Sequence, residues 1–362
     1  MIKVLIVEDS RTVSQYLEYI LSSDPEIEVI GNVPNGKMAI EFVEKNKPDI
    51  ITMDIDMPVM NGLEATRRIM STTPVPVIVV TASRNAYEVN ISIEALAAGA
   101  LTVIKKPVGF GHPNQDELIN KLISMVKIYS QVKVVKRKIK PVEPIPVKAI
   151  KNTGKINTKT PPTNKLLKRK YVVIGISSGG PQVLIKIFSK ISEDFPYPIL
   201  VVQHITQGFL EGMVTWLDRL CKIPIHTAQD REKILPGHIY FAPNKFQMGI
   251  NNDTIELRKC DEKIRICPSA EYLFNSLAKD HGKDTIAMLL TGMGTDGAQE
   301  LKNLKVAGAI TIAQDEESSL VFGMPGKAVE LNGVDHLLNP DQIRDVLLKL
   351  EEANFLKKNV IL

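Results

Sequence analysis

Short, nearly continuous apolar runs alternate with amphipathic stretches along most of this chain. Runs of Val, Ile and Leu bounded by turn residues are typical of strands that are buried on both faces of a parallel sheet. In the first half the predicted strands are Ile2–Val7, Asp49–Met53, Val77–Val80 and Leu101–Ile104. In the second half they are Val172–Ile176, Ile199–Gln203, Ile239–Phe241, Thr285–Thr291 and Ala309–Ala313. Helical patterns such as Leu63–Met70 and Glu88–Ala98 lie between them, so each half is predicted to be an α/β domain with a mostly parallel sheet.

The two halves are separated by a stretch whose composition is unsuited to a packed core. Between Gln131 and Lys170 there are 13 Lys or Arg, one acidic residue (Glu143), five Pro and no aromatic residue. Its formal charge is +12, which leaves −8 for the remainder of a chain whose net charge is +4. So little apolar surface does not offset the entropy lost on ordering. We therefore predict a basic, Pro-containing linker at 126–169 between domains at 1–125 and 170–362. A nucleic-acid or acidic-membrane patch is the alternative, disfavoured because no aromatic residue or motif accompanies the basic residues.

Length and composition fit two ordinary globular domains. The chain has 362 residues, 44% of them hydrophobic and 24% charged. Acidic residues interrupt the apolar start where a signal peptide would continue, and no apolar run reaches the roughly 18 residues that span a bilayer. Three cysteines (Cys221, Cys260, Cys267) are too few and too widely spaced for a disulfide framework or a zinc cluster. We expect a soluble, cytoplasmic protein.

Carboxylates follow two of the predicted strands in the first domain. Glu8 and Asp9 come directly after the predicted strand Ile2–Val7, and Asp54 follows the predicted strand Asp49–Met53. Because the carboxyl ends of parallel strands meet at one sheet edge, the three side chains are expected to lie together. Their mutual repulsion raises their pKa values unless a cation sits among them. A hard divalent ion such as Mg²⁺ satisfies that need.

Two more polar residues stand at strand ends of the same domain. Thr81 stands at the end of the predicted strand Val77–Val80, and Lys106 follows the predicted strand Leu101–Ile104. A hydroxyl, an ammonium group and a metal ion around Asp54 would stabilise charge on a phosphoryl group transferred to its carboxylate. Acidic residues at strand ends are often only solvated loop residues, but five suitable residues at four strand ends favour a site.

This set resembles the receiver domain of two-component response regulators over about residues 1–125. The matching motifs are Val7-Glu8-Asp9-Ser10, Asp54 with Met57-Pro58 and Asn61-Gly62, Thr81-Ala82, Ala98-Gly99-Ala100 and Lys106-Pro107. The resemblance implies a flavodoxin-like fold in which Asp54 accepts a phosphoryl group from a histidine kinase of chemotaxis. It also implies that Glu8 and Asp9 help Asp54 to hold Mg²⁺, and that Thr81 and Lys106 form the phosphorylation switch. Val103 stands where many receivers have an aromatic residue, so an aromatic-rotamer switch is not expected.

A glycine-rich turn opens the second domain. Gly175-Ile-Ser177-Ser-Gly179 follows a strand and fits the G-x-S-x-G pattern, which presents a serine on a tight strand-to-helix turn beside backbone N–H donors. The start of the next helix favours developing negative charge. Such a turn also binds phosphates or merely reverses the chain, so the pattern alone leaves the nucleophile undecided.

A base and a carboxylate stand at the corresponding ends of two further strands. His204 ends the strand at Ile199–Gln203, a placement that none of the other five histidines shares. Asp296 lies in the glycine-rich turn after the strand at Thr285–Thr291, where it orients an imidazole or caps the helix that follows. The resulting order Ser…His…Asp differs from that of α/β-hydrolases, and triads recur by geometry and not by order.

The motifs resemble the catalytic domain of chemotaxis protein-glutamate methylesterases over about residues 170–355. The matching segments are Ile174-Gly-Ile-Ser-Ser-Gly-Gly180, Val202-Gln-His204, Gly208-Phe209, Pro236-Gly237, Ala242-Pro243, Pro268-Ser269, Leu273-Phe274, Leu290-Thr-Gly-Met-Gly-Thr-Asp-Gly297, Gln314-Asp315 and Val321-Phe-Gly-Met-Pro325. The resemblance implies Ser177 as nucleophile, His204 as general base and acid, and Asp296 as the residue that orients it. It also implies oxyanion donors at Met293 and near Ser178, and no cofactor for the esterase reaction.

Three positions depart from the family pattern. Ser178 replaces the usual Thr and keeps the hydroxyl, Ile205-Thr206 replaces Met-Pro, and Gln247 stands where a histidine is common. The last two are expected near the cleft, where they would alter substrate preference or rate.

The hypothesis is a phosphorylation-regulated hydrolase that removes γ-methyl esters from glutamates of methyl-accepting chemotaxis receptors and deamidates receptor glutamines. Its expected partners are those receptors and their kinase, with no nucleic acid and no stable membrane insertion. Two other classes stay open: a regulator whose second domain binds proteins without turnover, and a transcriptional regulator that uses the basic segment on DNA. The intact triad speaks against the first, and the lack of a helix-turn-helix pattern speaks against the second.

Overall fold

The computed structural model describes residues 1–81, 94–96, 98–107, 115–132, 134, 159–161, 170–261 and 266–360, with side chains up to 352. The chain divides into two compact units, Met1–Glu143 and Pro144–Leu362. Most of the predicted linker lies outside the described residues, as does most of the helix predicted at Glu88–Ala98. The last helix of the first unit, α5 (Gln115–Ser130), runs past the predicted boundary at 125.

The first unit is built on a five-stranded sheet in the order β2-β1-β3-β4-β5, with every neighbouring pair parallel. Its strands are β1 (Ile2–Val7), β2 (Ile27–Val33), β3 (Ile50–Met53), β4 (Val77–Thr81) and β5 (Thr102–Lys105). The four predicted strands are confirmed. The sequence analysis did not identify β2, because this edge strand is only partly buried and contains Glu28, Gly31 and Asn32.

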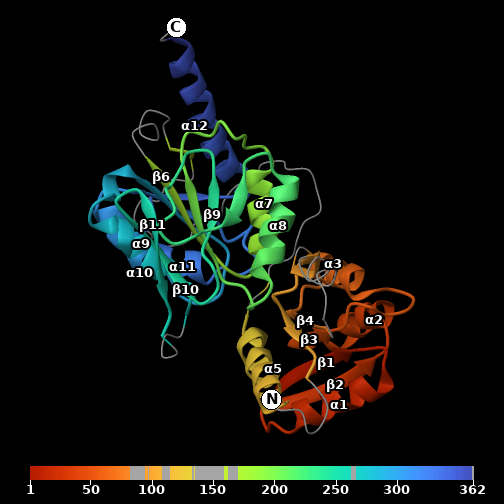
Figure 1. The fold of residues 1–362 in the computed structure, drawn as a ribbon. Coiled ribbons are helices and arrows are strands. Elements are labelled where there is room, and N and C mark those ends of the chain that lie inside the picture. Colours follow the sequence, from red (N-terminus) through yellow and green to blue (C-terminus); the bar gives the residue numbers. More distant parts are fainter. Residues whose placement is uncertain are drawn as a thin grey trace. The chain divides into compact units, whose positions relative to one another are not determined.

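Helices cover both faces of this sheet. The described ones besides α5 are α1 (Arg11–Ser22), α2 (Gly36–Asn46) and α3 (Gly62–Thr72). Apolar residues of α1 and α5, such as Leu17 and Leu122, pack in one core with alternate residues of the central strands, such as Val4 and Ile6. Helices α2 and α3 pack against each other (Figure 1). Asn35 and Asn61 cap these two helices by accepting a hydrogen bond from a backbone N–H of the first turn.

The second unit contains a seven-stranded parallel sheet in the order β14-β13-β12-β6-β7-β9-β8. Its strands are β6 (Tyr171–Ile176), β7 (Ile199–Gln203), β8 (Ile225–Thr227), β9 (Ile239–Phe241), β12 (Thr285–Leu289), β13 (Ile310–Gln314) and β14 (His336–Leu338). The five predicted strands are confirmed. The two edge strands, β8 and β14, were not identified because each is short, contains a histidine and is only partly buried, so neither forms a continuous apolar run.

In the described part of the second unit, an antiparallel hairpin and six α-helices surround this sheet. The hairpin, also not identified from the sequence, joins β10 (Phe246–Asn251) to β11 (Thr254–Lys259). The helices are α7 (Gly180–Phe188), α8 (Leu210–Leu220), α9 (Ala270–Ala278), α10 (Ala298–Val306), α11 (Met324–Glu330) and α12 (Pro340–Val360). Helices α9, α10 and α11 share one core with the hairpin and the sheet, while α7 and α8 lie on the other face, with α12 against α7 (Figure 1).

Part of the segment predicted as linker packs on the second unit. The carbonyl oxygen of Lys159 lies 2.7 Å from His336 Nδ1, and Lys349 Nζ donates to Thr160 Oγ1 at 3.2 Å. Pro161 is buried. The described end of this segment is therefore attached to β14 and α12.

Two of the three cysteines form a disulfide, although the sequence analysis judged the cysteines too few and too widely spaced for a disulfide framework. Cys260 follows β11 and Cys267 precedes α9, and their two Cα atoms lie 6.4 Å apart. Cys221 is free, and burial followed by the charge of Asp218 raises the pKa of its thiol to about 11. The spacing of Cys260 and Cys267 therefore did not exclude a disulfide between them.

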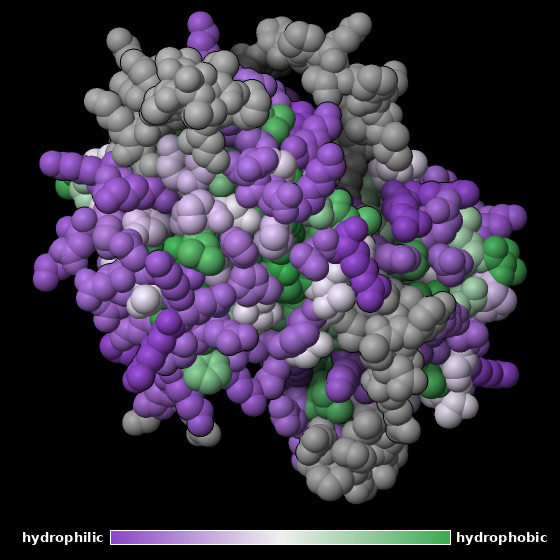
Figure 2. All heavy atoms as spheres, turned by 45° about the horizontal axis from the view of Figure 1, so that its top comes forward, coloured by the Kyte–Doolittle hydropathy of each residue, from purple (hydrophilic) through white to green (hydrophobic). Residues whose placement is uncertain are grey.

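Hydrophilic side chains dominate the molecular face in Figure 2, with small, scattered hydrophobic groups. Among the helices that the structure describes, none combines the length and apolar character needed to cross a bilayer.

Candidate functional site

The five polar residues predicted at strand ends of the first unit meet at one edge of its sheet. We call this set, Glu8, Asp9, Asp54, Thr81 and Lys106, the acidic edge. The backbone N–H of Asp54 donates to Val7 O at 2.9 Å, which places the end of β3 beside the end of β1. In the same way Lys106 N–H donates to Thr81 O at 2.8 Å. The parallel strands therefore bring the chemistry together as predicted.

A single ammonium group faces both buried carboxylates of the acidic edge. Lys106 Nζ donates to Asp54 Oδ2 at 2.8 Å and lies 2.8 Å from Glu8 Oε2. Burial raises the pKa of Glu8, and the nearby charge of Asp54 adds to this, against the effect of Lys106. Burial likewise raises the pKa of Asp54 despite its bonds to Lys106 and to the N–H of Ile55. Burial disfavours the charged form of Lys106, but the hydrogen bonds to the two carboxylates outweigh it, so the pKa of this ammonium is raised.

The three carboxylates of the acidic edge fit a divalent cation. One oxygen from each of Glu8, Asp9 and Asp54 lies within 4.8 Å of the others, with Asp9 exposed and the other two buried. Oxygen ligands of this kind suit Mg²⁺, which usually keeps several waters and takes few protein carboxylates. Three carboxylates face the one ammonium of Lys106 at this edge, so its formal charge is negative, which favours a cation there. Burial, which raises the pKa of Glu8 and of Asp54, adds to the cost of holding these carboxylates ionised.

The three residues predicted as a triad also follow neighbouring strands, β6, β7 and β12 of the second unit. We call this set, Ser177, His204 and Asp296, the serine edge. Ser177 N–H donates to Thr291 O at 2.9 Å, and His204 N–H donates to Ile176 O at 2.9 Å. Gly179, which precedes α7, has a φ of 84°, a left-handed conformation that glycine adopts without strain. The predicted strand–turn–helix is therefore present, and Ser177 is only partly buried.

Asp296 is fixed by the start of a helix. Its Oδ2 accepts from Ala270 N–H at 2.7 Å and its Oδ1 accepts from Glu271 N–H at 3.1 Å. These donors belong to the first turn of α9, whose positive end favours a carboxylate. The sequence analysis left open whether Asp296 caps α10, the helix that follows it. The N-cap residue of α10 is Gly297, and no side chain caps this helix. Asp296 therefore binds the N-terminal turn of α9 and not that of α10.

The imidazole of His204 lies against this fixed carboxylate. His204 Nε2 is 2.9 Å from Asp296 Oδ2, although the contact is not aligned as a hydrogen bond. The side chain of Asp296 is 3% exposed and that of His204 is 20% exposed, so a ligand from solvent can contact the imidazole but not the carboxylate. Ser177 Oγ makes no hydrogen bond to the ring within the described part of the chain. Because Nε2 faces Asp296, Nδ1 is the nitrogen left for the serine.

Two backbone N–H groups beside Ser177 are available to an oxyanion. Met293 N–H and Ser178 N–H have no acceptor among the residues that the structure describes. Met293 follows Gly292, which packs so closely that a Cβ there would lie 2.6 Å from Ser177 Cβ. Unused donors next to a serine hydroxyl are an arrangement that can stabilise a tetrahedral intermediate.

Three buried polar side chains that the sequence analysis missed form hydrogen bonds to the backbone around the serine edge. Gln203 Nε2 donates to the carbonyl oxygens of Ser177 and His204, both at 2.9 Å. Thr291 Oγ1 donates to Ser178 O at 2.9 Å and accepts from Val321 N–H at 3.1 Å. Gln314 Oε1 accepts from Thr291 N–H at 2.9 Å. The available signal was the position of each polar residue at the end of an otherwise apolar strand.

Gln247, one of the departures from the family pattern, does not point to the triad. Its Oε1 accepts from Ser269 N–H at 2.7 Å and from Ser269 Oγ at 3.1 Å, and its Nε2 donates to Ile266 O at 3.1 Å. These bonds hold Ser269, the N-cap residue of α9. Gln247 therefore supports the helix that binds Asp296. Of the other departures, Val103 is buried in β5, and Ile205 and Thr206 are partly buried after His204.

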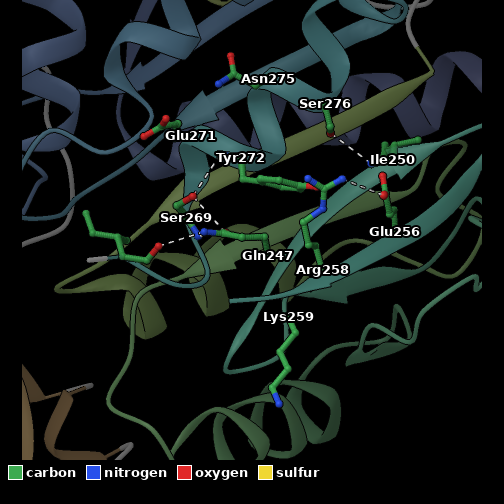
Figure 3. Close-up of a pocket in the computed structure, with 11 residues that line it drawn as sticks. Gln247, Ile250, Glu256, Arg258, Lys259, Ser269, Glu271, Tyr272, Asn275 and Ser276 are labelled. Carbon is green, nitrogen blue, oxygen red and sulfur yellow. Dashed lines mark hydrogen bonds and ion pairs between the residues drawn. The ribbon is translucent and has the colours of Figure 1, made fainter. Parts of the chain in front are cut away.

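A cavity of about 710 Å³ lies between α9 and the β10–β11 hairpin. Figure 3 shows Arg258 beside the ring of Tyr272 and Gln247 directed at Ser269. The guanidinium carbon of Arg258 is 5.8 Å from the centre of that ring, and the guanidinium forms an ion pair with Glu256 at 3.6 Å. The first turn of α9 thus lines this cavity and also binds Asp296.

Both parts of the chain match families of known proteins. Residues 172–347 match the family model described as CheB methylesterase, and residues 4–122 match the response regulator receiver domain.

Full-length relatives and a solved domain are also similar. A protein-glutamate methylesterase/protein-glutamine glutaminase of Nitrosospira multiformis is 44% identical over 353 residues, 97% of each chain. One of Geobacter metallireducens, numbered 4, is 43% identical over 352 residues, 97% of this chain and 99% of the relative. The crystal structure of the Thermotoga maritima CheB methylesterase catalytic domain is 35% identical, with a TM-score of 0.48, and covers 50% of this chain and 98% of that one.

Proposed function

This chain belongs to the protein-glutamate methylesterase/protein-glutamine glutaminase family, with a receiver domain before its catalytic domain, and we propose how its residues perform that activity. The enzyme hydrolyses γ-methyl esters of glutamate and deamidates glutamine in methyl-accepting chemotaxis receptors. Ser177 is the nucleophile, His204 is the general base and acid, and Asp296 orients the imidazole.

The reaction is an acyl transfer in two halves. Ser177 Oγ attacks the γ-carbonyl carbon while its proton moves to His204, and the N–H groups of Met293 and Ser178 stabilise the oxyanion. The tetrahedral intermediate then expels methanol, or ammonia from a glutamine, which leaves with the proton held by His204. Water attacks the acyl-enzyme, gives its proton to His204 and releases the glutamate, and Ser177 recovers its proton.

One observation supports the triad most strongly: the carboxylate next to His204 is immobilised before any substrate arrives. Asp296 accepts two backbone N–H groups of α9 and lies 2.9 Å from His204 Nε2. A carboxylate held in this way stabilises the imidazolium that forms when Ser177 loses its proton. A mere helix cap would not require a histidine at that distance.

Regulation is assigned to the acidic edge. Asp54 accepts a phosphoryl group from the chemotaxis histidine kinase, and Thr81 and Lys106 respond to the new charge. Glu8, Asp9 and Asp54 would hold Mg²⁺, which supplies positive charge to the phosphoryl oxygens when bound. Lys106, 2.8 Å from both buried carboxylates, is placed to pair with the phosphoryl group instead. The partners are the kinase and the receptors in the cytoplasm, with no nucleic acid and no membrane insertion.

Release of methanol from methylated receptor tests this function. The full chain should release methanol, a small-molecule phosphodonor with Mg²⁺ should change the rate, and Asp54→Asn should remove that response while keeping the basal rate. Ser177→Ala should release none. Equal methanol release by Ser177→Ala and the unsubstituted protein would refute the assigned mechanism.

A further inference from the structure

Gln203 is the last residue of β7 and lies opposite Ile176, the last residue of β6. The nucleophile and the base follow these two residues directly. We propose that Gln203 is a positioning residue that sets the distance between Ser177 and His204, and that Gly180 is a glycine because the Gln203 amide needs its space. This inference rests on the proposed function.

One –NH₂ group joins the backbones of the two reacting residues. Gln203 Nε2 donates to Ser177 O and to His204 O, both at 2.9 Å, so both of its protons are used. The ladder between β6 and β7 ends with the bond from His204 N–H to Ile176 O. Beyond that bond the two backbones leave the sheet, and the Gln203 amide continues the connection between them.

The side-chain amide of Gln203 lowers the stability of the fold, so folding does not explain its presence. Gln203 is 3% exposed, and its Oε1 is buried without a hydrogen-bond partner in the described part of the chain. Its neighbours in β7, Val201 and Val202, show that the strand otherwise takes apolar residues. An unpaired buried oxygen lowers stability, so the residue is explained by what its nitrogen holds.

Gly180, at the start of α7, leaves room for this amide. A Cβ on Gly180 would lie 2.0 Å from Gln203 Oε1, 2.8 Å from its Cδ and 2.9 Å from its Nε2. These are the three nearest atoms, and all belong to Gln203. The φ of Gly180 is not in the left-handed region, so the backbone conformation does not require glycine. We therefore attribute the glycine at position 180 to the space that the Gln203 amide occupies.

The consequence for catalysis follows from the distance between the Ser177 hydroxyl and the His204 imidazole. A shift of about 1 Å between reacting groups costs on the order of 100-fold in rate. Gln203 binds only backbone carbonyls, so its loss should lower kcat and leave KM unchanged.

Substitution of Gln203 gives the first test, in the full chain with methylated receptor. Gln203→Met keeps the length and removes the donors, and kcat should fall roughly 10- to 100-fold with KM within about twofold. Labelling of Ser177 by a fluorophosphonate should slow in parallel. Gln299→Met, on the exposed face of α10, is the control and should change neither rate.

The pH profile of Gln203→Glu separates positioning from general stability. A neutral carboxylic acid has one O–H donor and a carboxylate has none. Relative to the unsubstituted enzyme, Gln203→Glu should therefore regain activity as the pH falls. Ionisation of a buried Glu also lowers stability, so each rate is divided by the folded fraction measured at the same pH by circular dichroism. After that correction a purely structural defect would leave the ratio constant with pH, and this result would overturn the proposal.

A double substitution tests the link to Gly180. Gly180→Ala alone should lower kcat about as much as Gln203→Met, but in a Gln203→Ala background it should cost less than about twofold, because the clash is gone. An equal loss in both backgrounds, or a kcat of folded Gln203→Met within twofold of the unsubstituted value, would overturn the proposal. If the unsubstituted enzyme releases no methanol but fluorophosphonate labelling still depends on Gln203, the substrate assignment fails and the positioning role stands.

Discussion

The acidic edge and the serine edge occupy the same place in two parallel sheets, yet their electrostatics are opposite. At the acidic edge, Glu8 and Asp54 are buried with raised pKa values and share the single ammonium of Lys106. At the serine edge, the buried carboxylate of Asp296 accepts two backbone N–H groups of α9. The first edge is left with unbalanced charge, and the second is held by hydrogen bonds.

This difference corresponds to two kinds of task. An edge with unbalanced charge responds strongly when a cation or a phosphoryl group arrives, because either one changes the electrostatic balance. An edge whose polar groups are held in advance costs little reorganisation during a reaction. The same topology therefore supports a switch in one unit and a catalyst in the other.

The largest expected effect comes from Asp296→Asn. The amide cannot stabilise the imidazolium, and its own N–H atoms compete with those of Ala270 and Glu271 for the same space. The kcat for methanol release should fall roughly 10³- to 10⁴-fold. Asp54→Asn, measured without phosphodonor, is the matched control at the other edge and should keep the basal rate. A loss below tenfold would show that the serine edge is not organised around Asp296.

Removal of Lys106 should have an intermediate effect, on stability. Lys106→Met leaves Glu8 and Asp54 without their cation, which should lower the free energy of unfolding of the first unit by about 1–3 kcal/mol. Hydrogen exchange of the amides in β1 and β3 measures this unit separately. Lys105→Met is the control, because Lys105 is exposed and next in sequence. Equal exchange in the two variants would contradict the shared-lysine description.

The smallest expected effect is the pH dependence contributed by Asp54. Its pKa is raised in the folded state, so the folded state holds its proton to higher pH than the unfolded state does. Stability is therefore lost as the pH rises from the ordinary carboxyl pKa of about 3.9 through the raised value. Asp54→Asn removes this loss, so its gain in unfolding temperature should be larger at neutral pH than near pH 4.

At neutral pH, Mg²⁺ should reduce the difference in unfolding temperature between Asp54→Asn and the unsubstituted protein, because the ion stabilises the unsubstituted protein. A gain from Asp54→Asn that is the same at both pH values would mean that burial does not disfavour the carboxylate.

Sequence reasoning found the residues at the ends of well-buried strands and missed the groups that hold them. Continuous apolar runs identified nine strands, and the polar residues after them included both candidate sites. The partners of Asp296 escaped because Ala270 and Glu271 act through backbone N–H groups 26 and 25 residues away, which no side-chain pattern reports. The Cys260–Cys267 disulfide was missed because it depends on the packing of α9 against the β10–β11 hairpin, which the spacing of the cysteines does not show. Local pattern predicts the elements, whereas tertiary packing decides which backbone groups meet.

The most direct test of the account is to label the full chain with a fluorophosphonate and locate the adduct by mass spectrometry. The serine edge predicts one adduct on Ser177, none in Ser177→Ala, and much slower labelling in His204→Ala. A protein-binding domain without turnover would leave Ser177 unlabelled. An unmodified Ser177 in the folded, full-length protein would contradict the central claim that this edge is a preorganised acyl-transfer site.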